Sequence, residues 1–263
     1  MTFPFISTQE AIDSDDLVMT VVTAVPSPWG EAAKAILQIK EIDFKAVPFD
    51  PRDTDQATWT GVTNAPCLIK KGEINKTGWL DILLYAERTE PSPPLIPTDP
   101  MDRAFMLGFA HEIMGEEGLC WARRVQLIHM GLEEEAEGGF PAPLASSLAG
   151  KYGADVMDKA TAEHRVIKLM TMIADRLISQ ESIGSPYLIG RSLTALDIYV
   201  ATSMVLFAPL SDDQCAMHPR MRTAFETPPP PAVKALLPQL AEYRNQIYKD
   251  HMTLPVQLAP IVH

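Results

Sequence analysis

The chain has 263 residues, which is enough for one large domain or two of ordinary size. Its 46% hydrophobic and 21% charged residues are typical of a globular protein. A net charge of −12 repels phosphate backbones, so we expect no nucleic-acid partner. We also expect no membrane partner, because no apolar run reaches the roughly 18 residues that cross a bilayer.

The three cysteines, Cys67, Cys120 and Cys215, are odd in number and widely spaced. This spacing predicts neither a disulfide framework nor a zinc cluster. We therefore expect no bound metal and a reducing, cytoplasmic compartment. Residues 1–16 lack the basic start and apolar stretch of a secretory signal, and we interpret them as an N-terminal extension.

The first half of the chain alternates short apolar runs with helical patterns. LVMTVVTA (17–24) is short and β-branched, which predicts a buried strand, and a helix is predicted after the break at Pro26 to Gly30. A strand–helix–strand unit of this kind predicts a parallel pair with a right-handed crossover. The other predicted elements are a strand over 44–50, a polar irregular stretch over 51–64, a hairpin of 67–71 and 73–75 around Gly72, and a helix over 79–90.

A linker over 91–100 contains five prolines in ten residues, which excludes a helix or a central strand there. We place the boundary between a first domain, 17–90, and an all-helical second domain, 101–263, at this linker. In the second domain, helices are predicted from Pro100, with Asp99 as N-cap, and over 119–132, 159–179, 194–208 and 232–249, where Pro238 is expected to break or restart the last helix.

The segment VPSPWGEAAKAIL (25–37) places Ser27, Pro28 and Trp29 where the first strand gives way to a helix. A serine before a proline at a helix start is commonly an N-cap, with the proline at the first helical position. The segment also resembles the serine-type active-site segment of the glutathione transferase superfamily, most nearly that of the plant tau class. The arginine that the family usually has in the following helix is missing, and Lys34 lies in that region.

The segment TNAPCLI (63–69) resembles the family's cis-proline segment, which leads into the third strand. The resemblance implies a cis bond between Ala65 and Pro66 and a backbone contact from Ala65 to the cysteine part of glutathione. It places Asn64 in the same glutathione site. For Cys67, the next residue, a small buried strand position is the simpler interpretation.

The segment KTGWLDILLYAER (76–88) departs from the family pattern. Relatives have Glu-Ser or Gln-Ser before this helix, and that serine holds the γ-glutamyl carboxylate of glutathione. Either Thr77 and Gly78 or Gly78 and Trp79 stand there instead, depending on a shift of one residue. The backbone amides of the helix start can still bind a carboxylate, and Thr77 supplies a hydroxyl, but one anchoring side chain of the usual site is lost.

The segment GRSLTALDIYVA (190–201) contains Thr194 and Asp197 at the spacing of a capping box. The same box opens the central helix of the family's second domain. It supports the fold and says nothing about chemistry.

The resemblance covers residues 17–255 and implies an α/β thioredoxin-like N-terminal domain followed by an all-α C-terminal domain, in a homodimer. The implied activity is glutathione-dependent conjugation or reduction of small hydrophobic electrophiles, with Ser27 stabilising the thiolate. The implied glutathione-binding residues are Trp29, Asn64, Ala65, Pro66, Thr77 and Gly78. Met106, Phe109 and Met114 are candidates for the electrophile pocket, and core packing is the alternative role for each.

Two other interpretations stay open at this point. The first is a protein of this fold without transferase activity, which serves binding or assembly. The second is a protein whose site holds another thiol or a hydrophobic cargo.

Overall fold

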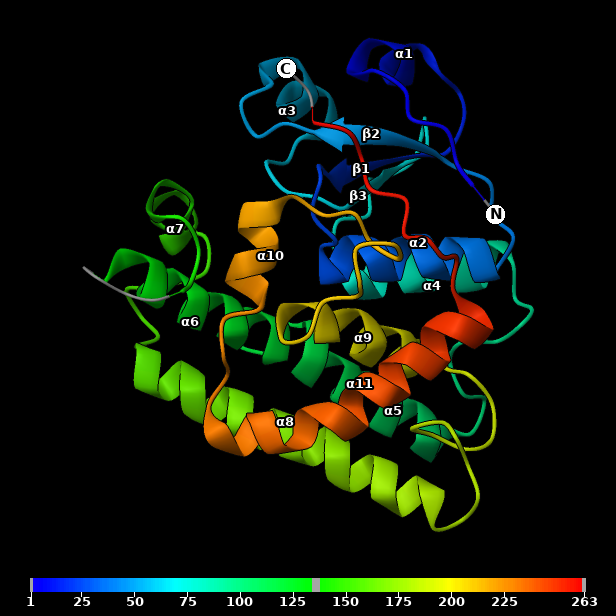
Figure 1. Cartoon of the computed structure of the whole chain (residues 1–263). Helices are drawn as coiled ribbons and strands as arrows, with labels where there is room; N and C mark the ends of the chain where they lie inside the picture. The colour runs from blue at the N-terminus through cyan, green and yellow to red at the C-terminus, as the bar shows by residue number, and fades with distance from the viewer. Residues whose placement is uncertain (1, 134–137, 262–263) are drawn as a thin grey trace. The chain divides into compact units, whose positions relative to one another are not determined.

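The computed structural model describes residues 2–133 and 138–261, and the chain divides into two compact units (Figure 1). Unit 1 comprises Met1–Leu95, Ser211–Met217 and Tyr248–His263. Unit 2 comprises Ile96–Leu210 and His218–Ile247. The first division falls inside the predicted linker, but the two later segments of unit 1 differ from the prediction that all of 101–263 forms the helical domain.

Backbone hydrogen bonds attach these two later segments to unit 1. The Val256 N–H donates to the Gln214 carbonyl oxygen, and the Ala24 N–H donates to the Ala259 carbonyl oxygen, each at 2.8 Å. Pairing between residues so far apart in the chain leaves no periodic pattern in the sequence, so a division by composition alone misses it.

Unit 1 is built on a three-stranded sheet in the order β2-β1-β3. The strands are β1 (Val18–Val22), β2 (Lys45–Phe49) and β3 (Cys67–Ile69), and each was predicted. β1 is parallel to β2 and antiparallel to β3, with Thr20 opposite Cys67. The central strand is buried along nearly its whole length, as its β-branched composition predicts.

Two amphipathic helices, α2 (Pro28–Ile39) and α4 (Trp79–Thr89), pack against each other in unit 1. Figure 1 shows them side by side on one face of the sheet, with α1 and α3 on the other side of it. Both helices were predicted from apolar residues at helical spacing.

The short helices α1 (Thr8–Asp13) and α3 (Thr54–Thr60) were not predicted. The first begins with a capping box in which Ser7 and Glu10 bond each other's backbone amides. The second begins at Asp53, whose side chain accepts from two amides, and ends at Gly61 with a φ of 70°. These caps were readable in the sequence, but helices of one to two turns carry too few apolar residues for a periodic signal.

The predicted hairpin around Gly72 is wrong in its second arm. Residues 73–75 form no strand, and the chain pairs instead at one point, where Leu68 and Lys76 exchange backbone hydrogen bonds of 2.8 and 2.9 Å. The second arm of the predicted hairpin is therefore replaced by a single bridge at Lys76, one residue after the predicted strand.

Unit 2 consists of helices in the residues that the structure describes. They are α5 (Pro100–Met114), α6 (Leu119–Leu132), α7 (Ala142–Ala149), α8 (Lys159–Glu181), α9 (Ala195–Ser203), the 3-10 turn η1 (Met204–Leu206), α10 (Pro219–Phe225) and α11 (Pro231–His251), whose last turn belongs to unit 1. The helices from Pro100 and over 119–132 begin as predicted, and the Asp99 side chain accepts from two amides of the first turn. α7 and α10 were not predicted.

The expected break at Pro238 is also wrong, because α11 continues through this residue. A proline removes one helical hydrogen bond and crowds the preceding turn, which favours a break in an isolated helix. The apolar residues that α11 buries on both sides of it, Val233 and Leu240, hold the helix together across that position.

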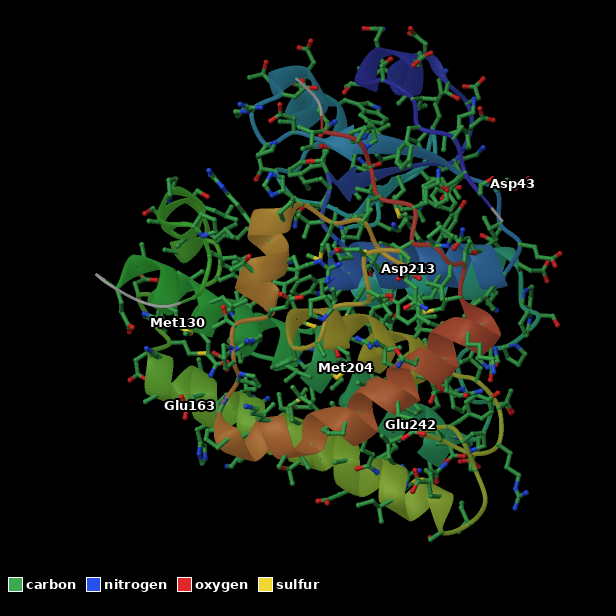
Figure 2. The ribbon with its side chains drawn as sticks, in the orientation of Figure 1. Asp43, Met130, Glu163, Met204, Asp213 and Glu242 are labelled. Atoms are coloured by element: carbon green, nitrogen blue, oxygen red, sulfur yellow. The ribbon has the colours of Figure 1, made fainter. Side chains whose placement is uncertain are left out.

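The core of unit 2 is formed where α6 packs against α7 and α8, and where α5 packs against α6 and α9. Met204, labelled in Figure 2, is buried at the start of η1. α9 is buried on all sides, as predicted, and begins at the predicted box, in which the Thr194 N–H and hydroxyl donate to one Asp197 oxygen at 2.7 and 2.8 Å.

Candidate functional site

Ser27 lies at the N-cap of α2, with Pro28 at the first helical position. Its hydroxyl makes no capping hydrogen bond to the amides of the helix, although its backbone carbonyl accepts from the Glu31 N–H at 2.8 Å. The side chain is therefore not committed to the ordinary capping role that its position predicts. Ser27 is buried, with 3% of its surface exposed.

The Ala65–Pro66 peptide bond is cis, as the resemblance implies. Asn64, the residue before it, is half-buried, and its side-chain oxygen Oδ1 is buried without a hydrogen-bond partner among the described residues. A buried acceptor without a donor is unfavourable, and a ligand N–H placed there would satisfy it.

Thr77 and Gly78 precede α4, and Gly78 is its N-cap. Because Gly78 has no side chain, the first turn of α4 receives no side-chain cap. The first amides of a helix have no partner within the helix, so this end favours an anionic group. Asp81 in the same turn is exposed and contributes a competing negative charge.

The sheet brings these three segments to one end of unit 1. β1 runs toward Ser27, and because β3 is antiparallel to it, Pro66, which directly precedes β3, lies near the end of β1. The Cys67 N–H donates to the Thr20 hydroxyl at 3.1 Å. The bridge between Leu68 and Lys76 is also antiparallel, so Thr77 and Gly78 continue toward the same end.

The three candidates for the electrophile pocket are all buried on α5. Met106, Phe109 and Met114 have between 0% and 5% of their surface exposed. Phe109 contacts Phe105 edge to face, and the Met114 sulfur lies 4.0 Å from that of Cys120. Their burial favours core packing over a wall that is open to a ligand.

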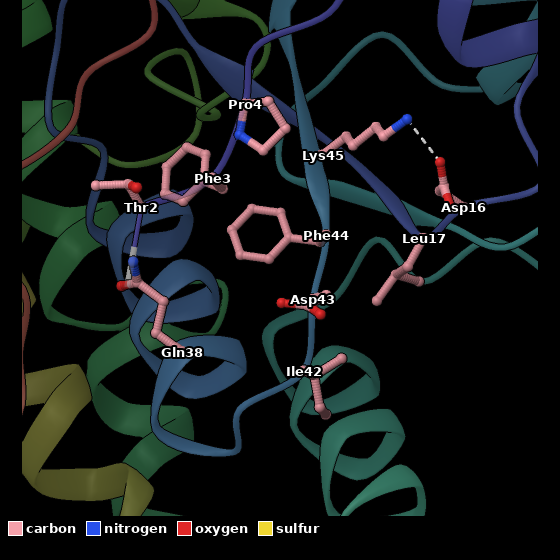
Figure 3. Close-up of a pocket in the computed structure, with 10 residues that line it drawn as sticks. All are labelled: Thr2, Phe3, Pro4, Asp16, Leu17, Gln38, Ile42, Asp43, Phe44 and Lys45. Atoms are coloured by element: carbon pink, nitrogen blue, oxygen red, sulfur yellow. Dashed lines mark ion pairs between the residues drawn. The ribbon is translucent and has the colours of Figure 1, made fainter.

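A cavity of about 250 Å³ lies at the other end of the sheet (Figure 3). Leu17, which precedes β1, and Phe3 and Phe44 are apolar side chains of its wall, and Lys45 and Asp16 form an ion pair of 2.7 Å at its edge. Ser27 follows β1, whereas this cavity surrounds its start. The cavity is therefore separate from the candidate site.

Sequence reasoning assigned no function to the buried charges of α2. Lys34 and Glu31 form an ion pair of 2.7 Å, and Lys34 Nζ also donates to the Gln257 carbonyl oxygen at 2.8 Å. The ammonium group lies 5.7 Å from the centre of the Phe3 ring. Two charged residues on the apolar side of the predicted helix could have indicated a buried ion pair. The contact of Lys34 with Gln257 in the C-terminal segment could not be predicted from the sequence.

The cysteines and acidic groups of the described residues indicate no further reactive centre. Cys67, Cys120 and Cys215 are buried and form no disulfide, and burial raises the pKa of the Cys67 thiol to about 11 and that of Cys120 to about 12. In residues 2–133 and 138–261, no group of three or more His, Cys, Asp or Glu side chains is arranged to hold a metal ion. Over the same ranges, no helix combines the length and apolarity that a membrane span requires.

Comparison with known proteins gives matches in structure only. No protein-family model matches the sequence, and no curated protein sequence matches it. A glutathione S-transferase from Methylobacterium radiotolerans, in complex with glutathione sulfonate, is 18% identical with a TM-score of 0.59 and covers 94% of this chain and 100% of its own. A Tau class glutathione S-transferase from mango, Mangifera indica, is 19% identical with a TM-score of 0.52, covering 90% and 99%.

A glutathione S-transferase from Methylobacillus flagellatus, with glutathione bound, is 15% identical with a TM-score of 0.56, covering 94% of this chain and 100% of its own. Identities this low carry information about architecture and none about individual site residues. With the sheet, the cis-proline and the helical unit, these likenesses show that the chain has the glutathione transferase fold.

Proposed function

We propose that this protein is a glutathione-dependent transferase that acts on small hydrophobic electrophiles in the cytoplasm, as a homodimer. The observation that carries the proposal is Ser27, a hydroxyl at the start of α2 that is not used as a cap. The likeness to structures with bound glutathione or glutathione sulfonate supports the choice of co-substrate.

The residues at this end of unit 1 would each bind a different group of glutathione. The unpartnered Oδ1 of Asn64 would accept a peptide N–H, and the backbone of Ala65, before the cis bond to Pro66, would pair with the cysteine part. The backbone amides at the start of α4 and the Thr77 hydroxyl would hold the γ-glutamyl carboxylate. Trp29, in the first turn of α2, would contact the peptide.

Glutathione supplies a thiol, which reacts as the thiolate. A thiol of this kind has a pKa of about 8.5, so little of it is ionised at neutral pH. The Ser27 hydroxyl would donate a hydrogen bond to the sulfur, and the N-terminal end of α2 would favour the negative charge. Both effects lower the thiol pKa without a general base.

Replacing Ser27 by alanine is expected to raise the pKa of the bound thiol by about 1 to 2 units, because a hydrogen bond to a charged group contributes about 1.5–3 kcal/mol. At neutral pH, kcat/KM with a model electrophile should fall about 10- to 100-fold. The melting temperature should stay the same, because the hydroxyl makes no cap. The thiol pKa is measured from the ultraviolet absorbance of the thiolate during a pH titration.

Thr77→Val is the matched control, since it removes a hydroxyl from the same site. We expect it to raise the KM for glutathione and to leave the thiol pKa unchanged. Equal thiol pKa values in the Ser27→Ala variant and the unmodified protein would contradict the assignment of Ser27.

A protein of this fold that serves binding or assembly is the second candidate. Two observations favour it: Ser27 is only 3% exposed, and no Glu-Ser or Gln-Ser pair precedes α4. Such a protein would conjugate no model electrophile at millimolar glutathione, and Ser27→Ala would change nothing measurable. Turnover that Ser27→Ala abolishes in a folded variant would exclude it.

A further inference from the structure

The C-terminal segment of the chain hydrogen-bonds to the turn between β1 and α2, residues 23–27. Ala259 lies beside Thr23 in a parallel bridge, and its carbonyl oxygen accepts from the Ala24 N–H at 2.8 Å. Ala24 has a φ of 54°, in the left-handed region that a Cβ atom disfavours. A residue in such a conformation depends on the contacts around it to stay there.

The same segment is fixed at a second point, two residues earlier. The Gln257 carbonyl oxygen accepts from Lys34 Nζ on α2 at 2.8 Å. The Gln257 side chain donates to the Phe3 carbonyl oxygen at 2.7 Å and accepts from the Phe3 N–H at 3.4 Å. We call residues 256–259 the C-terminal clasp. In Figure 1 this red segment runs past α2 toward β1, so it reaches the turn from anchors on α2 and on the N-terminal segment.

We propose that the C-terminal clasp positions Ser27 by holding Ala24 in its left-handed conformation. Ser27 follows Ala24 by three residues, and the turn between them is tight, since the Ser27 N–H donates to the Val25 carbonyl oxygen at 3.0 Å. A change of φ at Ala24 rotates this turn and moves the Ser27 hydroxyl. Gln257 and Ala259 are positioning residues in this account, which rests on the function proposed above.

Two shortened chains that differ by two residues test the role of Ala259. A chain ending at Leu258 lacks the acceptor for the Ala24 amide, and a chain ending at Pro260 keeps it. In the first, we expect faster hydrogen exchange at the Ala24 amide, a raised pKa of bound glutathione thiol and a kcat lower by about 10- to 100-fold, with little change in KM for glutathione. The second should behave like the full chain.

Ala24→Gly in the chain ending at Leu258 provides a rescue. Glycine adopts a φ of 54° without the steric conflict, so the variant is expected to recover part of the lost kcat. Since glycine at this φ can also restore stability, kcat and the thiol pKa are compared at a temperature where all the chains are fully folded. Gln257→Ala in the full-length chain removes the side-chain contacts to Phe3, so we expect smaller changes in Ala24 exchange, thiol pKa and kcat. This variant tests the proposal if the chain ending at Leu258 does not fold.

Unchanged Ala24 exchange in the chain ending at Leu258 would overturn the proposal. The proposal would also be overturned if the Ser27→Ala change raises the pKa of the bound thiol in the full chain but the chain ending at Leu258 leaves that pKa unchanged. A full-length protein that leaves the thiol pKa of glutathione at its solution value would contradict the proposed function instead. In that case, faster hydrogen exchange at the Ala24 amide in the chain ending at Leu258 than in the full chain would still show that the C-terminal clasp holds the turn.

Discussion

Replacing Asp197 by alanine is expected to lower the free energy of unfolding by about 4 kcal/mol, which is larger than the loss caused by most single substitutions. The buried carboxylate accepts four hydrogen bonds: from the Leu188 N–H at 2.7 Å, the Thr194 N–H and hydroxyl at 2.7 and 2.8 Å, and the Tyr243 hydroxyl at 2.6 Å. Each donor left buried without an acceptor costs about 1–3 kcal/mol, and partial relaxation reduces the sum.

Asp99→Ala is the matched control for this variant. Asp99 also caps a helix of unit 2 and accepts from the Met101 and Asp102 amides at 2.9 and 3.0 Å, but it is exposed. Water replaces the lost acceptor there, so we expect a loss of about 1 kcal/mol. Urea unfolding followed by circular dichroism compares the two, and equal losses would show that burial of the Asp197 box is not what stabilises unit 2.

Replacing Lys34 by methionine is expected to lower the free energy of unfolding by about 3–5 kcal/mol, because it leaves the Glu31 carboxylate buried without its positive partner. The variant also loses the hydrogen bond to the Gln257 carbonyl oxygen. The double variant Glu31→Leu with Lys34→Met removes both charges and should recover most of the stability, since a buried ion pair can be replaced by apolar residues at little cost.

Lys71→Met removes the partner of Asp15 in an ion pair of the same length, 2.7 Å, whose side chains are 64% and 83% exposed. Solvent screens such a pair, so this control should show no measurable change in the denaturation midpoint. A Lys34→Met variant as stable as the Lys71→Met variant would contradict the importance of the buried pair.

The Lys34→Met loss should also depend on pH. Burial raises the pKa of the Glu31 carboxyl, against the lowering effect of Lys34, so removing Lys34 raises that pKa further. A group whose pKa is raised on folding stabilises the fold below its ordinary pKa, and this contribution is lost as the pH rises through the folded pKa. Urea unfolding at several pH values should therefore show the smallest loss in acid and the largest at neutral pH.

The parts of the fold that the sequence predicted are those with a local signal. β1 is a short β-branched run, and α2 and α4 repeat apolar residues at helical spacing. α3 lacks such a pattern and is fixed by its caps, which is why it was missed. The continuation of α11 through Pro238 was also missed, because it depends on packing that no local pattern records.

The candidate site was predictable in its segments and not in its surroundings. Ser27, Pro66 and Gly78 are each marked by a proline or glycine next to a strand or helix. The Ala259 and Gln257 contacts join residues more than two hundred positions apart, and no local rule connects them. The unusual φ of Ala24 is likewise a product of the folded chain, since alanine gives no sequence signal for the left-handed region.

A crystal structure of the protein with glutathione would show whether Ser27 contacts the reacting sulfur. We expect the glutathione sulfur within hydrogen-bonding distance of the Ser27 hydroxyl, and a peptide N–H of glutathione donating to Asn64 Oδ1. A glutathione molecule bound with its sulfur elsewhere, or a Ser27 hydroxyl that points away from a bound glutathione, would contradict it.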